Sequence, residues 1–283
     1  MKSPAILLLS ALFVAAGTPT AYAQLTAANE GPIVYGHHHL NVTSVDEHTR
    51  FWVDTLGGTS AAAGPLALIR FPNVFIVTTP QPPNGGTKGS SVNHLGFSVP
   101  SVAALLDTVR AAGYPIVTRE ELPPALAVEN DMAHIADQDT FIAFVMGPDN
   151  VKVELFEHRD QTAPIALHHI HFATQDVDAM QAWYAKIFGA TPGMRGSFQD
   201  ADLPGVNLTF SPSDEPLAGT QGRSLDHIGF EVDNLEAFCE KLEAAGITFD
   251  RPYTVIDSIG LAIAFFTDPF GTYIELTEGL DGV

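Results

Sequence analysis

The sequence predicts an α+β fold built from four βαβββ units, and two observations carry that prediction. The first is an internal repeat: Val92–Val99 recurs as Leu225–Val232, and Gly147–Leu155 recurs as Asp268–Leu276. The second is the order of patterns within each half, which runs strand, helix, strands and then strand, helix, strands again. Because 283 residues exceed one ordinary domain, we expect the four units to pair into two tandem domains.

Residues 1–23 are predicted to be a secretory signal peptide rather than part of the fold. Lys2 precedes the apolar run Ala5–Ala16, and Ala21-Tyr22-Ala23 is a cleavage site of the small-x-small type. The apolar run is too short to cross a bilayer as a helix. We therefore expect a periplasmic or secreted protein that has no membrane segment after cleavage.

Four segments are predicted to be the helices of the units. Val102–Gly113 matches Leu235–Gly246, and Phe51–Gly57 matches Trp183–Gly189. The two longer segments carry apolar residues at helical spacing, and all four stop at glycine, which is favoured just beyond a helix. Short apolar runs after the helices are predicted to be strands: Leu66–Phe71, Val74–Thr78, Val206–Phe210 and Ile263–Phe266.

The predicted domain boundaries follow the repeat. The first domain is expected at residues 33–158 and the second at 165–278, joined by a linker at 159–164. One segment breaks the symmetry, because Arg119–Thr140 is about twelve residues longer than its counterpart Arg251–Gly260. An extra loop of this kind is either a lid or specificity element beside a site, or a plain surface insertion.

The charge balance excludes two classes of partner. The chain has 13 Lys and Arg residues against 33 Asp and Glu residues, which gives a formal net charge of −20. A polyanion repels nucleic acid and anionic lipid, and the sequence shows no basic stripe. We therefore expect a small-molecule partner, and the sequence leaves the oligomeric state open.

Two of the repeated motifs resemble those of a known family. They are His227-Ile228-Gly229-Phe230, which precedes a predicted helix, and Asp268–Leu276 at the end of the chain. With them, the duplicated chain is similar to the vicinal oxygen chelate superfamily, the glyoxalase, bleomycin-resistance and extradiol-dioxygenase group. The resemblance covers nearly all of the chain after residue 23. It implies that paired βαβββ units curl into an open cup with a divalent metal at its base.

The resemblance also implies where the metal ligands lie. They come from the first strand of one unit, and from the first and last strands of the next unit. Because side chains alternate along a strand, His37, His39 and Asn41 are expected to face the cup in the first half, and His169 and His171 in the second.

An alignment of Asp46 with Asp176 selects the ligand on each first strand, because it pairs His39 with His169. Each half then has two histidines and one glutamate at matching positions, and such a match is hard to explain by structural histidines alone. Two triads are predicted: His39, His94 and Glu154, and His169, His227 and Glu275.

Two imidazoles and one carboxylate are the ligand set of non-haem iron oxygenases, so iron(II) is the favoured metal, with manganese(II), zinc(II) and nickel(II) as alternatives. Four further residues are predicted to act in catalysis. Asn41 and His171 face the cup beside the predicted ligands and either contact substrate or hydrogen-bond a ligand. His134 and Tyr253 are candidates for the histidine and tyrosine that extradiol dioxygenases place near their metal.

Three functions remain open at this point. A metal-dependent dioxygenase of the ring-cleaving type, acting on a small substrate with vicinal oxygens, is the leading one. A glyoxalase-like lyase or isomerase is disfavoured, because those relatives use a further carboxylate and the matching strands in Leu66–Pro80 and Val206–Phe210 contain none. A non-catalytic binding or resistance protein is the third, although such relatives usually lack the triad.

Overall fold

A computed structural model describes residues 25–64 and 66–280 of the chain. The predicted signal peptide, residues 1–23, lies outside the described residues. Within the described ranges, no helix is long and apolar enough to cross a membrane.

The first of two eight-stranded sheets combines strands of the first and fourth units. Its strand order is β14-β15-β16-β13-β1-β4-β3-β2, so β1 and β13 pair antiparallel at its centre. The strands from the first unit are β1 (Val34–Val42), β2 (Thr59–Ala63), β3 (Leu66–Phe71) and β4 (Val74–Pro80). Those from the fourth unit are β13 (Leu225–Glu231), β14 (Arg251–Ile256), β15 (Leu261–Thr267) and β16 (Tyr273–Glu278).

The second sheet is built from the middle of the chain. Its order is β10-β11-β12-β9-β5-β8-β7-β6, with β9 and β5 antiparallel at the centre. The second unit supplies β5 (Val92–Val99), β6 (Ala133–Ile135), β7 (Thr140–Met146) and β8 (Lys152–Glu157). The third unit supplies β9 (Ala166–Thr174), β10 (Thr191–Arg195), β11 (Phe198–Leu203) and β12 (Val206–Pro212).

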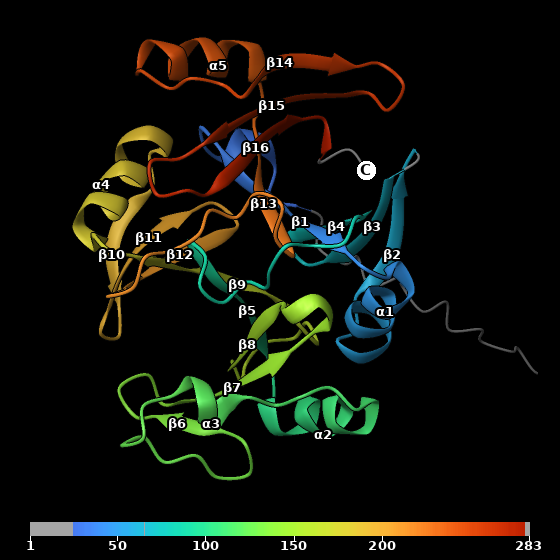
Figure 1. Ribbon diagram of the computed structural model, residues 1–283, viewed down its shortest axis with the longest axis vertical. Helices are drawn as coiled ribbons and strands as arrows, with labels where there is room; N and C mark the ends of the chain where they lie inside the picture. The colour runs from blue at the N-terminus through green and yellow to red at the C-terminus, as the bar shows by residue number, and fades with distance from the viewer. Residues whose placement is uncertain (1–24, 65, 281–283) are drawn as a thin grey trace, which may run out of the picture.

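One helix follows the first strand of every unit, and all of these helices lie at the periphery (Figure 1). They are α1 (Val45–Thr49), which continues into η2 (Arg50–Thr55), α2 (Val102–Ala112), α4 (Val177–Phe188) and α5 (Leu235–Ala244). Each begins after a Ser, Asp or Asn whose side chain accepts a hydrogen bond from the first turn. The short α3 (Thr118–Glu121) belongs to the insertion in the second unit. Their apolar faces cover the sheets and enclose one large core.

The predicted fold class is confirmed, because four βαβββ units form two curled eight-stranded sheets. The expected pairing of consecutive units is different. Units one and four share a sheet, units two and three share the other, and the predicted linker 159–164 connects β8 to β9 of one sheet. The sequence could not distinguish the two pairings, because β5 and β13 carry the same motif. The free edge of β1 could accept either strand, and the repeat alone does not choose between them.

Candidate metal sites

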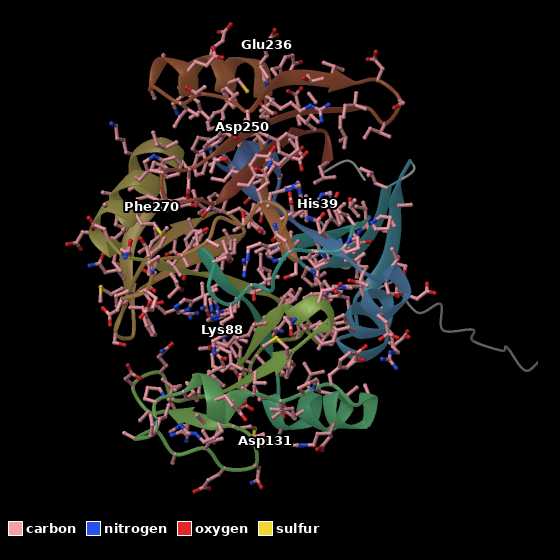
Figure 2. All side chains as sticks on the ribbon, viewed as in Figure 1. His39, Lys88, Asp131, Glu236, Asp250 and Phe270 are labelled. Carbon is pink, nitrogen blue, oxygen red and sulfur yellow. The ribbon has the colours of Figure 1, made fainter. Side chains whose placement is uncertain are left out.

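Two clusters of three histidines and one glutamate lie on the central strands of the two sheets. Site A consists of His37, His39, His227 and Glu275, and site B consists of His94, Glu154, His169 and His171. In each cluster the candidate ligand atoms all lie within 4.8 Å of one another. Figure 2 shows His39 of site A near the middle of the view, whereas Glu236 of α5 and Asp131 of the insertion lie towards its top and bottom ends.

A glycine in the repeated motif brings two ligands of each site together. In site A, Gly229 of β13 lies between His37 of β1 and Glu275 of β16 in the strand register. Because Gly229 has no side chain, the His37 ring lies directly over it, and His37 Nε2 reaches Glu275 Oε2 at 2.8 Å. A methyl group at this position would overlap the ring. The motif His-x-Gly thus makes room for a histidine from another unit.

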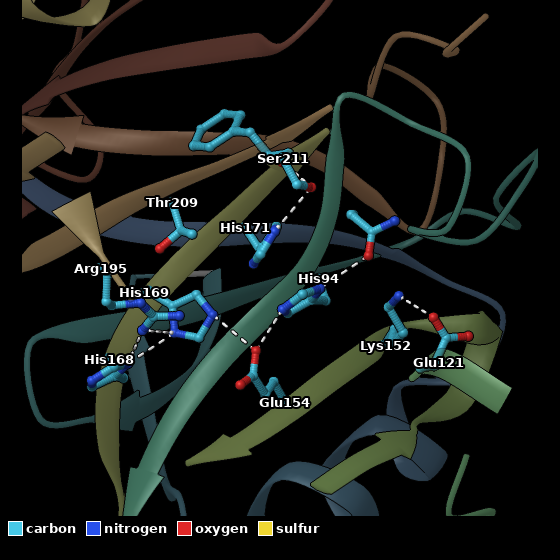
Figure 3. Close-up of polar contacts among 12 residues, drawn as sticks. His94, Glu121, Lys152, Glu154, His168, His169, His171, Arg195, Thr209 and Ser211 are labelled. Atoms are coloured by element: carbon cyan, nitrogen blue, oxygen red, sulfur yellow. Dashed lines mark hydrogen bonds and ion pairs between the residues drawn. The ribbon is translucent and has the colours of Figure 1, made fainter. Parts of the chain in front are cut away.

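Site B repeats this arrangement. Gly96 of β5 lies between His169 of β9 and Glu154 of β8, and the His169 ring covers it. Glu154 Oε2 lies 3.1 Å from His169 Nε2 and 2.8 Å from His94 Nε2, as Figure 3 shows. In site A, His227 Nε2 is likewise 2.9 Å from Glu275 Oε2. Each glutamate therefore holds two imidazoles through their Nε2 atoms.

The fourth member of each site is a histidine that a hydroxyl group holds. His39 Nε2 lies 2.7 Å from Thr79 Oγ1, and His171 Nε2 lies 3.0 Å from Ser211 Oγ. His171 stacks on His94 with ring centroids 4.4 Å apart, and its buried Nδ1 has no hydrogen-bond partner. This free nitrogen gives the ring a lone pair or a proton to offer inside the site.

An acid distinguishes site A from site B. Asp226 Oδ1 lies 2.7 Å from His227 Nδ1, whereas the matching atom in site B is Asn93 Oδ1, 3.0 Å from His94 Nδ1. Burial lowers the pKa of His227, but its hydrogen bonds with Asp226 and Glu275 outweigh this and raise the pKa to about 8. A carboxylate behind a ligating histidine also fixes the tautomer that leaves Nε2 free for metal.

The histidines of site B are held neutral. Burial, and after it the charge of Arg195, keeps the pKa of His169 well below its usual range. Burial and the neighbouring His94 and His169 do the same for the pKa of His171. Burial alone would raise the pKa of Glu154, but its contacts with His169 and His94 lower the pKa well below the ordinary value. Site B thus offers neutral imidazoles and an ionised carboxylate at neutral pH.

Site B opens into a cavity of about 640 Å³. Its walls include His94, Glu154 and His171 of the site, together with Arg195 and Lys152. The insertion in the second unit forms part of the wall, through residues that include Glu121, Leu122, Leu126 and Ile135. The insertion therefore lies beside a site, as the first of its two interpretations requires.

The predicted triads are not brought together as expected. His39 lies with His227 and Glu275 rather than with His94 and Glu154, and His169 lies with His94 and Glu154. The exchange follows from the sheet pairing, because each first-strand histidine joins a unit from the other half of the chain. In addition, the residue that corresponds to His169 is His37, since both lie over the motif glycine.

The four residues predicted for catalysis have different positions. His171 belongs to site B. Asn41 hydrogen-bonds Asp226 and the carbonyl of Arg223, which fits its alternative role of supporting a ligand. His134 is exposed on the edge strand β6, where it faces Asp139, so it is not a member of either site. Tyr253 packs against the core cluster on β14 and is also absent from both sites.

Sequence reasoning missed three residues that shape the sites. His37 was placed on the correct face but not selected as a ligand. Asp226 was visible directly before a motif histidine, where its first-half counterpart is Asn93. Arg195 left no signal in the sequence, because it reaches site B from the end of β10 only in the folded sheet.

Both donor sets fit a divalent metal. In each site, two histidines present Nε2 to the same glutamate oxygen. The third histidine bonds a hydroxyl group through Nε2 and offers Nδ1 to the site. Together these side chains form a compact cluster of nitrogen and anionic oxygen donors. This combination suits iron(II), manganese(II), nickel(II) or zinc(II) better than calcium, which prefers oxygen donors alone. Residues His37, His227 and Glu275, and residues His169, His94 and Glu154, would hold the ion.

Comparison with known proteins agrees with this fold. Residues 166–276 match the family model described as the Glyoxalase/Bleomycin resistance protein/Dioxygenase superfamily. The matched segment runs from β9 into β16. The chain is 27% identical over 173 residues to lactoylglutathione lyase of Schizosaccharomyces pombe, which covers 48% of this chain and 54% of that protein. The aligned part thus spans about half of that relative.

Other relatives extend over more of the chain. A probable chloroplastic lactoylglutathione lyase of Arabidopsis thaliana is 22% identical over 270 residues, which is 87% of this chain and 73% of the relative. The solved structure of glyoxalase I from Zea mays has a TM-score of 0.67 at 16% identity, covering 90% of this chain and 95% of its own. A putative dioxygenase from Bacillus subtilis has a TM-score of 0.64 at 14% identity, covering 91% and 86%. Because both solved structures share the fold, the fold alone does not select a reaction.

The metal affinities of the two sites should depend differently on pH. Metal must displace the proton of His227, whose pKa is about 8, so the metal affinity of site A should fall about tenfold per pH unit between about pH 8 and about pH 6.5. Site B should hold its affinity over this range, because its histidines have lowered pKa values. Metal titrations of single-site variants at several pH values would measure this. Asp226→Asn copies Asn93 of site B and should flatten the pH dependence of site A; a slope unchanged by this substitution would contradict the assignment.

Proposed function

We propose that the protein is an exported, metal-dependent enzyme of the vicinal oxygen chelate superfamily that acts at site B on a small substrate with two adjacent oxygens. The observation that carries this proposal is the position of His94, Glu154 and His171 in the wall of a cavity of about 640 Å³. A ligand that enters this cavity meets the donor set directly. Site A supplies the same donors, and we assign the reaction to site B because of its cavity.

The residues of site B have two proposed roles, metal binding and proton transfer. His94, His169 and Glu154 would hold the metal, which would supply positive charge to polarise adjacent substrate oxygens. His171 remains for proton transfer, since Ser211 orients its ring and its Nδ1 has no partner. The lowered pKa of His171, caused by burial and by His94 and His169, keeps the ring neutral, which is the form that accepts a proton.

Within this class we favour a ring-cleaving dioxygenase that uses iron(II). Strands β4 and β12, where the glyoxalase pattern has a further carboxylate, instead direct the hydroxyls of Thr79 and Ser211 to the fourth histidine of each site. Two histidines, one glutamate and a proton-accepting histidine suit oxygen chemistry on a chelated diol. A lyase or isomerase is the second candidate, and the names of the Schizosaccharomyces pombe and Arabidopsis thaliana relatives favour it.

Oxygen uptake would separate the two candidates. We expect protein loaded anaerobically with iron(II) to consume oxygen when a catechol is added, and to leave lactoylglutathione unchanged. His171→Ala should slow this turnover at least about tenfold while the metal content stays close to that of the wild type. The matched variant is His39→Ala, which removes the corresponding histidine of site A and should leave the turnover unchanged.

Two outcomes would overturn the proposal. Conversion of lactoylglutathione without oxygen uptake would favour the lyase candidate. Binding of catechols with equal affinity to metal-loaded and chelator-treated protein, without turnover, would instead favour the non-catalytic binding protein.

A further inference from the structure

Arg195 is a partly buried cation that lines the cavity of site B and forms no ion pair with a described carboxylate. Its Nη1 donates towards Nδ1 of His168 at 2.8 Å and Nδ1 of His169 at 3.1 Å (dashed lines in Figure 3). The guanidinium lies over the ring of Phe156. Its Nε is buried without any hydrogen-bond partner. Among the described residues, Arg195 makes no ion pair. The two hydrogens of Nη2 make no hydrogen bond with a described residue, and they are the donors that remain for a ligand.

The other buried cation of the cavity is already satisfied. Lys152 Nζ lies 2.6 Å from Glu121, which also accepts from the exposed Lys88 at 2.7 Å. Glu154 and Asp200 attract the charge of Arg195 without forming an ion pair with it. A planar carboxylate is the group that matches the donor geometry of a guanidinium. In a chain with a net charge of −20, a partly buried arginine that lies in a cavity wall, has a buried unpartnered Nε and makes no ion pair with a described residue points to an anionic ligand.

The remaining wall of the cavity is mainly apolar. It includes Leu122, Leu126, Ile142, Phe144, Phe156 and Phe198. The first two come from the insertion, and Phe198 begins β11 directly after the turn that follows Arg195. A ligand that fills the cavity therefore presents an apolar body to these side chains and an anionic group to Arg195.

We propose that Arg195 binds the carboxylate of a substrate with an apolar, ring-sized body, while the adjacent oxygens of that substrate face His94, His171 and Glu154. This inference rests on the proposed function and narrows its substrate class to organic acids. Arg195 acts as a specificity-determining residue: it selects an acid over the neutral molecule of the same shape. Site A contains no cation at hydrogen-bond distance from its histidines among the described residues, so the selection belongs to site B.

Protocatechuate and its methyl ester are matched probes, because they share the ring and the adjacent oxygens and differ in the carboxylate charge. We expect calorimetry with metal-loaded full-length protein to show roughly tenfold to a hundredfold tighter binding of the acid. Arg195→Met should reduce the affinity for the acid to that of the ester and leave the ester unchanged. Arg195→Lys should restore part of the preference, since the charge remains and the planar fork is lost.

Arg251→Met is the control variant. It removes the same charge from a guanidinium that lies over a ring, that of Phe265 on the other sheet, and it should change neither affinity. Metal analysis of each variant distinguishes loss of the ion from loss of the anion contact. Equal binding of acid and ester by the wild type, no binding of either, or a preference that survives Arg195→Met would overturn the inference. A preference that depends on Arg195 and persists in chelator-treated protein would support it while contradicting the proposed metal-centred function.

Discussion

Glu154→Gln should lower the metal content of the protein by one ion per chain, and Glu275→Gln should remove the other. Each glutamate is the only carboxylate among the candidate ligands of its site, and its Oε2 contacts two imidazole nitrogens. Glutamine keeps the shape but loses the charge that draws a cation into a buried cluster. Since replacement of a supporting residue already costs tenfold to a hundredfold in metal affinity, loss of a direct ligand should cost at least about a hundredfold.

Metal analysis after dialysis against a weak chelator would measure both variants. Glu157→Gln is a suitable control, because Glu157 lies on the same strand β8 but accepts from the backbone of Val102 and from Arg159. It should retain both ions. A stoichiometry that stays at the wild-type value in both Glu154→Gln and Glu275→Gln would remove the basis for two metal sites.

Gly96→Ala should abolish site B while site A remains, and Gly229→Ala should have the opposite effect. A methyl group at Gly96 would overlap the ring of His169, and one at Gly229 would overlap the ring of His37. The ring or the strand must move, and crowding of this kind costs about 1–3 kcal/mol of folding free energy in a packed interior. A shift of the imidazole also takes its Nε2 away from the glutamate.

Each glycine variant contains its own control, because the second site is unchanged. We expect one ion per chain in either variant, a lower free energy of unfolding, and catechol turnover lost only in Gly96→Ala. If both variants bind two ions as tightly as the wild type, the histidine that covers the glycine is not a ligand. This outcome would move the ligand role to His39 and His171.

The sequence predicted the secondary structure and the face of each strand well, because both depend on local periodicity. His37, His39 and Asn41 lie on one side of β1, whereas His38 points into the core, where its ring contacts Tyr35. Strand alternation is enforced by backbone geometry, so a two-residue period fixes these directions without knowledge of the partner strand.

The register between the halves was predicted incorrectly because the wrong residues were aligned. Asp176 caps α4, and the residue that caps α1 is Ser44, not Asp46. An alignment of the two caps pairs His37 with His169, as the structure does. Ser and Asp both accept from the first turn of a helix, so the cap position is set by its hydrogen bond and not by residue identity.

The pairing of the four units could not be predicted from the sequence. Both β5 and β13 offer a His-x-Gly motif to the edge of a first strand. The position of Arg195 was hidden for the same reason, because β10 approaches site B only after β9 has paired with β5. Long-range strand order follows from the summed packing of whole units, which no single motif encodes.

The pairing of units one and four sets an order of events during synthesis. Units two and three can pair as soon as β12 has left the ribosome, so site B can assemble from one continuous stretch of nascent chain. Strand β1 is made first, yet its partner β13 follows only after the whole of units two and three. Until then the edge of β1 has unpaired backbone groups that other chains could pair with. Because pairing of distant segments slows folding, we expect site A to be the last part to form.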